Sequence, residues 1–268
     1  MKFLYLITLV LLCPTLQADC PENFIKISSW NIRDLGQSKN ENEMKFIADI
    51  IKDSDVIAIQ EVVASDEGVK AVKRLLNVLK QNNERWRAVV SNRTTGDGVE
   101  RYAYLYNSVH VKTKNSSSNG LNQKLESTID REPYLQTFSF NGQDVHFASF
   151  HAVPTKKRPA HEIIQLQNID IFKKDESSIL MGDFNLGYRS KAFDSLRNLG
   201  LASHIRGKTA LKLKRKDGKH LTHPYDNVFT KKLNVCDAGI TDFSYGFETL
   251  KQARYISDHL PIWIKIPR

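Results

Sequence analysis

Short apolar runs with the alternating pattern of β-strands recur along this chain, and segments with helical spacing lie between them. Several strand-like runs follow one another directly, which predicts a mixed β-sheet. No interdomain linker interrupts the pattern, so we expect residues 19–268 to form a single α/β domain. Strands are predicted at residues 24–30, 56–60, 86–90, 102–106, 134–140, 145–151, 178–181, 227–230 and 260–266, and helices at residues 43–52, 69–81, 161–172 and 191–199.

The first 18 residues have the pattern of an export signal. Lys2 precedes an apolar stretch at residues 3–13, and the small residue Ala18 marks the expected cleavage point. Crossing a bilayer takes about 20 apolar residues, more than this stretch provides. We therefore expect a secreted or periplasmic protein with no stable membrane association. Cleavage would leave Cys20 and Cys236, which either form one disulfide or remain free thiols.

The chain is basic, with 39 Lys and Arg against 30 Asp and Glu and a formal net charge of +9. Such an excess favours a polyanionic partner, either nucleic acid or an anionic membrane surface. A basic loop at residues 208–219 concentrates the charge. The loop either contacts phosphates outside a binding cleft or is a solvated hairpin that turns at residues 217–218. Its candidate phosphate contacts are Lys212, Lys214, Arg215 and Lys216.

Polar and ionisable residues stand at the ends of several strand-like runs, where the active sites of α/β folds are commonly built. A single residue of this kind is more often a structural hydrogen-bonding partner, but five such motifs in one chain favour a catalytic site. The motifs are Trp30-Asn31-Ile32-Arg33, Gln60-Glu61-Val62, Ser149-Phe150-His151, Gly182-Asp183-Phe184-Asn185 and Ser257-Asp258-His259-Leu260-Pro261.

The order and spacing of these motifs resemble the endonuclease/exonuclease/phosphatase superfamily, over about residues 24–266. The resemblance implies a four-layered α/β sandwich of two mixed β-sheets flanked by helices. Its deoxyribonuclease I branch is the most similar, which implies an endonuclease that hydrolyses DNA to 5′-phosphate ends. The sequence suggests no protein partner, so a monomer is expected. The branch motifs are Asn31-Ile32-Arg33 with Gly36 and Lys39, Glu100-Arg101-Tyr102, Arg131-Glu132-Pro133 and Tyr225-Asp226.

Hydrolysis of a phosphodiester requires neutralised charge, an activated water and a protonated leaving group. Glu61 is the candidate ligand of Mg²⁺, because carboxylate oxygens suit this hard cation. Asn31 and Asp258 are expected beside the ion, directly or through water. Mn²⁺ is an alternative ion, and Ca²⁺ could bind structurally.

The two motif histidines are the candidate acid and base, because the pKa of imidazole is the nearest to neutrality. We expect His259 to act as the base on water and His151 as the acid towards the 3′ oxygen, and the reverse assignment stays open. The resemblance pairs His151 with Glu100 and His259 with Asp226.

Asp183 and Asn185 are two residues apart, so both can point to one face of an extended segment. Asn185 is expected to hydrogen-bond a phosphate oxygen, and Asp183 to orient the water or hold a metal. Gly182 is interpreted as a turn residue. The resemblance also implies that Arg33 and Arg131 contact DNA phosphates.

The chain departs from the deoxyribonuclease I pattern at several positions. The arginine and the tyrosine that enter the minor groove are replaced by Val63 and Gly98. The disulfide cysteines of the branch are missing near Tyr188 and His223, and near residues 116–120. Contacts with DNA are therefore expected to involve mainly its backbone.

Two other functions remain open at this point. An enzyme of the same fold could act on a lipid or inositol-phosphate head group, because a fold does not fix a substrate. A binding protein could use the scaffold without catalysis, although the presence of all the expected catalytic side chains argues against this.

Overall fold

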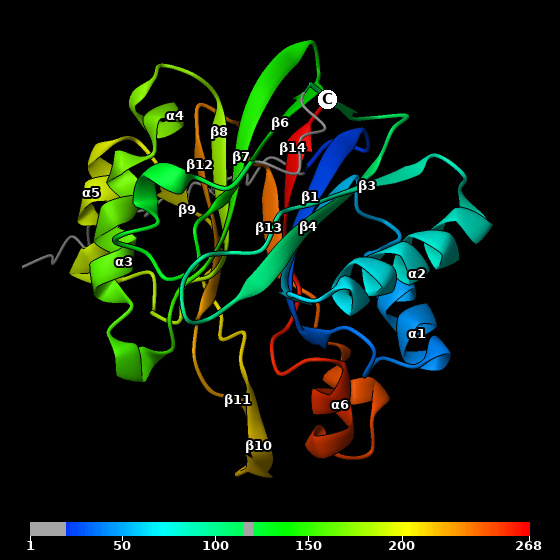
Figure 1. Cartoon of the computed structure of the whole chain (residues 1–268). Helices are drawn as coiled ribbons and strands as arrows, with labels where there is room; N and C mark the ends of the chain where they lie inside the picture. The colour runs from blue at the N-terminus through cyan, green and yellow to red at the C-terminus, as the bar shows by residue number, and fades with distance from the viewer. Residues whose placement is uncertain (1–19, 115–119) are drawn as a thin grey trace, which may run out of the picture.

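Two six-stranded β-sheets face each other and helices cover both outer faces, as Figure 1 shows for the computed structural model. This arrangement confirms the predicted four-layered α/β sandwich. The structure describes residues 20–114 and 120–268, so the expected export signal lies outside the described residues. Among the residues described, no helix is long and apolar enough to span a membrane.

The first sheet is built around a central parallel pair with antiparallel strands on both sides. In spatial order, its strands are β13 (Asp237–Ile240), β14 (Ile262–Pro267), β1 (Phe24–Leu35), β2 (Val56–Val63), β4 (Glu100–Asn107) and β3 (Trp86–Val90). Strands β1 and β2 form the parallel pair.

The second sheet repeats this plan. In spatial order, its strands are β5 (Lys112–Thr113), β6 (Tyr134–Phe140), β7 (Gln143–His151), β8 (Ser178–Asp183), β12 (Asp226–Lys231) and β9 (Ala202–Ser203). Strands β7 and β8 form the parallel pair. Each sheet thus has two neighbouring strands that end at the same edge.

Three apolar layers hold the sandwich together: one between the sheets and one beneath each set of helices. Aromatic rings fill much of the layer between the sheets, where the ring centroids of Phe138 and Phe147 are 4.9 Å apart. The helices outside the first sheet are α1 (Glu41–Ile51), α2 (Asp66–Asn82) and α6 (Leu250–Ile256), and those outside the second are α3 (Ala160–Gln165), α4 (Asp170–Lys173) and α5 (Asp194–Asn198) (Figure 1).

One predicted helix is interrupted, and some short elements were not predicted. The segment predicted as one helix at residues 161–172 forms α3, a single 3₁₀ turn and α4. Its buried residues Ile163, Leu166, Ile169 and Phe172 are spaced by three, which suits 3₁₀ geometry better than a continuous α-helix. Strands β5, β9 and β13 are too short for a sequence pattern. Helix α6 does have a readable start, a capping box between Thr249 and Gln252.

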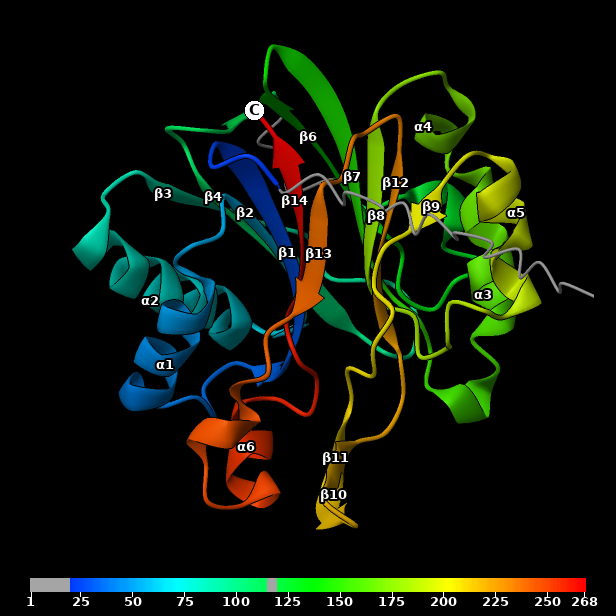
Figure 2. The same ribbon diagram turned by 180° about the vertical axis from the view of Figure 1, so that it is seen from behind.

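A hairpin extends beyond the ends of both sheets, as Figure 2 shows from behind. It consists of β10 (Leu211–Lys216) and β11 (Lys219–Leu221). Asp217 and Gly218 connect them with φ values of 52° and 70°, which suits a tight two-residue turn. The predicted turn at residues 217–218 is therefore confirmed.

The two cysteines of the described chain are joined in a disulfide. Cys20 and Cys236 have Cα atoms 5.1 Å apart, and 216 positions separate them in the sequence. The bridge ties the start of the described chain to the residue before β13, which answers the question left open by the sequence.

Candidate active site

The candidate site lies where the parallel pairs of the two sheets end. His151 and Asp183 are the last residues of β7 and β8 and are direct neighbours in the sheet register. Asn31 in β1 reaches across from the other sheet, and its Nδ2 donates to Asp183 Oδ2 over 3.2 Å. Because the carboxyl ends of parallel strands share an edge, side chains distant in sequence meet here.

Glu61 is turned into the site by an irregularity in β2. Its φ is +60°, and the pairing of β2 with β4 shifts register around it. A non-glycine residue in this region is strained, and such strain is found mainly at functional sites. Its Oε1 accepts a 2.9 Å hydrogen bond from Asn31 Nδ2, and the carboxylate borders a hollow of about 460 Å³.

Asn31 presents an oxygen that lacks a partner. Its Nδ2 serves Glu61 and Asp183, whereas its Oδ1 is buried and accepts no hydrogen bond within the described chain. A buried oxygen without a donor needs an explanation such as an ion. Beside a carboxylate, it forms the oxygen-rich environment that Mg²⁺ prefers.

His151 and Glu100 form the first histidine–carboxylate pair, which joins the two sheets. His151 Nδ1 lies 2.9 Å from Glu100 Oε2 at the start of β4. Burial has the largest single effect and opposes protonation of His151, but the charge and hydrogen bond of Glu100 together with the charge of Asp183 outweigh it and raise the pKa of His151. The carboxylate therefore fixes the ring and favours its imidazolium form.

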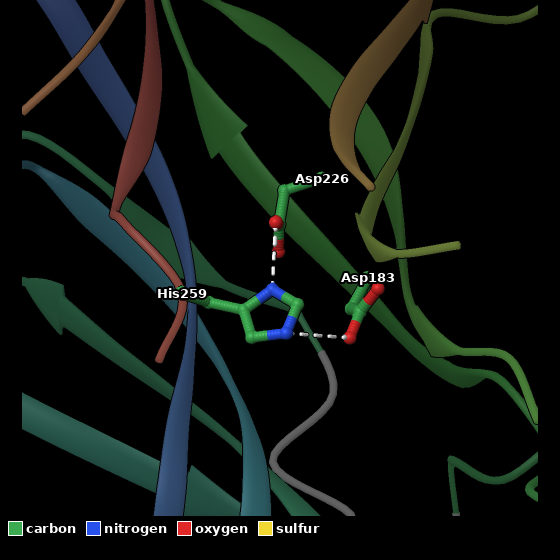
Figure 3. Close-up of side chains that lie close together, drawn as sticks. All are labelled: Asp183, Asp226 and His259. Atoms are coloured by element: carbon green, nitrogen blue, oxygen red, sulfur yellow. Dashed lines mark hydrogen bonds and ion pairs between the residues drawn. The ribbon is translucent and has the colours of Figure 1, made fainter. Parts of the chain in front are cut away.

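His259 and Asp226 form the second pair. Here the histidine lies beside the first sheet and the carboxylate in the second, the reverse of the first pair. His259 precedes β14 of the first sheet, and its Nδ1 lies 2.8 Å from Oδ2 of Asp226 in β12 of the second (Figure 3). Burial alone would lower the pKa of His259, but Asp226 and Asp183 outweigh it and raise that pKa well above its ordinary value.

Asp183 lies between the two imidazoles. Its Oδ2 is 3.4 Å from His151 Nε2 and 3.5 Å from His259 Nε2. Burial opposes its ionisation, but the two histidines outweigh burial and lower the pKa of Asp183. Both ring nitrogens that are free of the carboxylate pairs thus face one point, where a reacting group could lie.

The charges of the site favour an additional cation. Asp183, Asp226 and His259 each offer an atom within 4.8 Å of the others, a spacing that could hold a metal. Within this group, however, the imidazolium of His259 already pairs with both carboxylates. Taken together, Glu61, Glu100, Asp183 and Asp226 outnumber the positive charges of His151, His259 and Arg131 by one. A divalent cation would make the site positive and able to hold a phosphodiester.

Asn185 is held by the strand ends. Its φ is +48°, its backbone N–H donates to Asp183 Oδ1 over 2.8 Å, and its Nδ2 donates to the carbonyl of Ala152 over 3.0 Å. It thus lies beside Asp183, but in a left-handed conformation after the end of β8 and not on the extended segment predicted from the sequence. Its contact with a phosphate oxygen stays a prediction.

The remaining predicted residues lie in different environments. Arg131 is buried, and its Nε donates to the carbonyl of His151 over 3.0 Å, so it helps to fix the backbone of this catalytic residue. Asp258 forms an ion pair with Arg254 and, in the described chain, has no contact with Glu61. Arg33 is half-exposed at the rim. Phosphate contacts of Arg33 and Arg131 stay predictions.

Gly182 is not a turn residue, which corrects the expectation from sequence. It lies inside β8 with a φ of +140°, and a Cβ atom there would be 1.9 Å from the carbonyl oxygen of Phe150 in β7. The missing side chain allows the two strands to approach closely just before His151 and Asp183.

The close approach of Asp130 gives a structural reason for a glycine at position 98. A Cβ atom there would lie 2.5 Å from Asp130 Oδ2, which accepts a 3.0 Å hydrogen bond from the backbone of Gly98. A tyrosine at this position would require Asp130 to move. Val63 and Gly98 both border the hollow beside Glu61.

The basic hairpin starts from the site itself. Ala210 forms a β-bridge with His259, and the backbone N–H of Leu211 donates to the carbonyl of Asp258. Beyond this base, a groove of about 730 Å³ is lined by Arg254 and by the four predicted phosphate contacts, Lys212, Lys214, Arg215 and Lys216.

Two supporting residues were missed from the sequence. Thr209 donates to Asp226 Oδ2 over 2.5 Å. Ser257 donates to the carbonyl of Asn31 over 2.6 Å and accepts from the backbone of His259 over 3.0 Å. Ser257 stood in a motif but had no assigned role, and Thr209 has no sequence signal because it acts across 17 residues.

Comparisons with known proteins agree with this geometry. The pattern of the endonuclease/exonuclease/phosphatase family matches residues 28–259. Human deoxyribonuclease gamma is 25% identical over 90% of this chain and 86% of its own length. Rabbit deoxyribonuclease-1 is 26% identical over 90% of this chain and 92% of its own length. The structure of D. rerio TDP2 with a single-stranded DNA product superimposes with a TM-score of 0.65 at 16% identity, covering 91% of this chain and 99% of that one, which shows a shared fold.

Proposed function

Because the chain belongs to the endonuclease/exonuclease/phosphatase family, we propose that it is a secreted, metal-dependent endonuclease that hydrolyses phosphodiester bonds in DNA. The observation that carries the proposal is the convergence of two histidine–carboxylate pairs on Asp183, beside Glu61. The similarity to deoxyribonucleases over 90% of the chain supports DNA as the substrate.

A divalent cation fits the residues around Glu61. The partly exposed carboxylate and the unpaired oxygen of Asn31 would hold it, and we propose Mg²⁺ or Mn²⁺ on the chemistry of these donors. Asp258 would contribute through water at most, because it is paired with Arg254. When bound, the cation supplies Lewis acidity and neutralises charge on the phosphate.

The protein's own side chains would move the protons. The neutral form of His259 would be favoured by the positive charge of a bound cation beside it. In that form His259, supported by Asp226, accepts the proton of the attacking water. His151, supported by Glu100, donates a proton to the departing 3′ oxygen, which leaves a 5′-phosphate end. Asn185 binds a phosphate oxygen, and Asp183 orients the water between the two rings.

Plasmid DNA with and without a metal chelator tests this proposal. The supercoiled plasmid should be nicked in Mg²⁺, and EDTA should abolish the nicking. Sphingomyelin and an inositol phosphate serve as parallel substrates for the head-group alternative. Hydrolysis of either one without cleavage of DNA would refute the assignment to DNA. No hydrolysis of any substrate would favour a binding protein.

The basic hairpin supports DNA over a lipid surface. Leu213 is an exposed apolar residue, but it lies among four basic side chains of β10. Such a surface suits phosphates, whose binding releases counterions. We therefore propose that the hairpin extends the DNA contact beyond the cleft.

Neutralising the hairpin should weaken DNA binding and flatten its salt dependence. Each lost phosphate contact should reduce the slope of log affinity against log salt by about 0.7 to 0.9. Binding to a labelled duplex at several salt concentrations measures this slope. The variant replaces Lys212, Lys214, Arg215 and Lys216 with glutamine.

A control variant should separate local contacts from net charge. Replacing four basic residues at the outer helix α2 and the neighbouring strand β3 (Lys70, Lys73, Lys80 and Arg87) changes the net charge equally. This control should keep the slope of the unmodified protein. Equal slopes in both variants would show that the hairpin affects DNA binding only through the net charge of the protein.

The expected export of the protein agrees with its cysteine chemistry. Disulfides persist in oxidising compartments. The bond between Cys20 and Cys236 therefore supports a location outside the reducing cytosol.

A further inference from the structure

A second, smaller hollow lies beside the candidate site and is lined by cations. It has a volume of about 250 Å³. Its charged residues are Arg189, Arg206 and Lys208, and no carboxylate contributes to its lining. The ring of Tyr188 lies among them, so we call it the Tyr188 pocket. The remaining lining residues are Gly187 and Pro224.

The two arginines of the Tyr188 pocket are held in place. The guanidinium carbons of Arg206 and Arg189 lie 4.8 Å and 5.7 Å from the centroid of the Tyr188 ring. Arg206 also donates to the carbonyl and the hydroxyl of Ser203 over 2.7 Å and 2.9 Å, and Arg189 Nε donates to the hydroxyl of Tyr188. These contacts reduce the entropy that the side chains would lose on binding a ligand.

The positive charge of the pocket is not balanced by the protein. In the described chain, none of Arg189, Arg206 and Lys208 forms an ion pair, whereas the nearby Arg197 pairs with Asp194. Three like charges gathered around one hollow repel each other. An anion in the hollow would relieve this repulsion, and planar guanidinium groups match the geometry of phosphate.

The Tyr188 pocket is adjacent to the catalytic groups. Lys208 precedes Thr209, which donates to Asp226. Pro224 precedes Tyr225, whose ring stacks between His223 and His259 with centroid distances of 4.6 Å and 6.4 Å. Two residues that line the pocket, Lys208 and Pro224, are therefore immediate chain neighbours of residues that contact Asp226 and His259.

We propose that the Tyr188 pocket binds a backbone phosphate of the DNA strand being cut, next to the phosphate that reacts. This inference rests on the proposed nuclease function and adds a subsite to it. The pocket would hold the strand in register with His259 and would favour substrates with a phosphate beyond the scissile one. Free inorganic phosphate has the same chemistry and is the alternative occupant.

The test combines charge removal from the protein with charge removal from the DNA. The variant Arg206→Gln with Lys208→Gln is compared with the unmodified enzyme on short duplexes cut at one position. In each duplex a neutral methylphosphonate replaces one phosphate near that position. The matched control is Lys80→Gln with Arg87→Gln, which removes the same charges from a hollow on the outer face of the first sheet.

The expected result is a loss of kcat/KM of about tenfold or more on natural DNA, the scale of a lost charged hydrogen bond. At one position, the methylphosphonate should lower kcat/KM of the unmodified enzyme by a similar factor. The same methylphosphonate should not lower kcat/KM of the variant any further. The control should behave like the unmodified enzyme. All proteins should hydrolyse bis(p-nitrophenyl) phosphate equally, because this small diester does not reach the pocket.

An active variant with unchanged kcat/KM on DNA would overturn the proposal while the nuclease function stands. If this variant has also lost the thermal stabilisation that inorganic phosphate gives the unmodified protein, the pocket binds free phosphate and not the DNA strand. Lys208→Gln alone repeats the test if the double variant fails to fold, because Lys208 has no hydrogen bond or ion pair in the described chain. An unmodified protein that cleaves neither DNA nor the small diester would refute the nuclease function, and the subsite with it.

Discussion

Replacing His259 with asparagine should reduce kcat for phosphodiester hydrolysis at least about 10²-fold, the usual scale for losing a general acid or base. Asparagine can still donate a hydrogen bond to Asp226, so the fold should persist. The loss should appear with DNA and with a small diester, because the reacting phosphate is common to both. Circular dichroism and thermal unfolding check the fold. A folded variant with a nearly normal rate would exclude His259 from the chemistry.

His146 provides a matched control for the same experiment. It lies in β7 like His151 and also faces a carboxylate, with its Nε2 2.8 Å from Glu176 Oε2, but it precedes His151 by five residues in the strand. His146→Asn should retain activity, whereas His151→Asn should lose it like His259→Asn. Combining the two active-site substitutions should add little to either one, because groups that act as a unit are not additive.

The raised pKa of His259 should make the free energy of unfolding of the metal-free protein depend on pH. A group whose pKa is higher in the folded state contributes its full stabilisation below the unfolded value, about 6.5 for histidine. That contribution is lost as pH rises through the folded pKa. The free energy of unfolding in urea with EDTA should therefore fall on the alkaline side, and should fall less in His259→Asn. Equal falls would show that His259 does not hold the proton.

Gly182→Ala should destabilise the protein by about 3 kcal/mol or more, the combined effect of a disfavoured φ and an overpacked contact. The added Cβ would lie 1.9 Å from the carbonyl oxygen of Phe150, so β7 and β8 must separate. Because His151 and Asp183 end these strands, activity should fall even in the fraction that folds. Urea unfolding and kcat at a permissive temperature measure both effects.

Gly142→Ala distinguishes this contact from the effect of φ alone. Gly142 has a φ of +73°, and nothing lies within 4 Å of its potential Cβ atom. Its replacement should cost only about 1 kcal/mol, the usual penalty of the left-handed region. Similar losses in the two variants would contradict the close approach of β7 and β8.

The positions of the site residues were predictable where they depend on strand ends. Asn31, His151 and Asp183 follow apolar runs, and parallel strands bring such ends to one edge. The partners Glu100 and Asp226 came only from the family resemblance. Local patterns cannot show which carboxylate lies against which histidine, because each pair joins different sheets.

Packing decided what the sequence left out or misassigned. Gly182 looks like a turn residue until the backbone of Phe150 is placed against it. The family resemblance implies that Arg131 contacts a phosphate, and this stays a prediction, but its burial and its hydrogen bonds to the backbone carbonyls of His151 and Ala152 had no signal in the sequence. The Tyr188 pocket joins three separate chain segments, at residues 187–189, 206–208 and 224, that have no periodicity, so nothing in the sequence pattern marks it.

In each histidine–carboxylate pair the two partners lie at different sheets, so the catalytic rate should depend on how the two sheets are placed relative to each other. Glu100 reaches from the first sheet to His151 in the second, and Asp226 reaches from the second sheet to His259 beside the first. A small sliding of one sheet over the other would loosen both pairs at once, and a misplacement of about 1 Å can cost about 10²-fold in rate. Substitutions in the aromatic layer, such as at Phe138 or Phe147, could therefore behave as kinetic mutations although they lie far from the phosphate. The interior of the sandwich is thus constrained by the reaction as well as by stability.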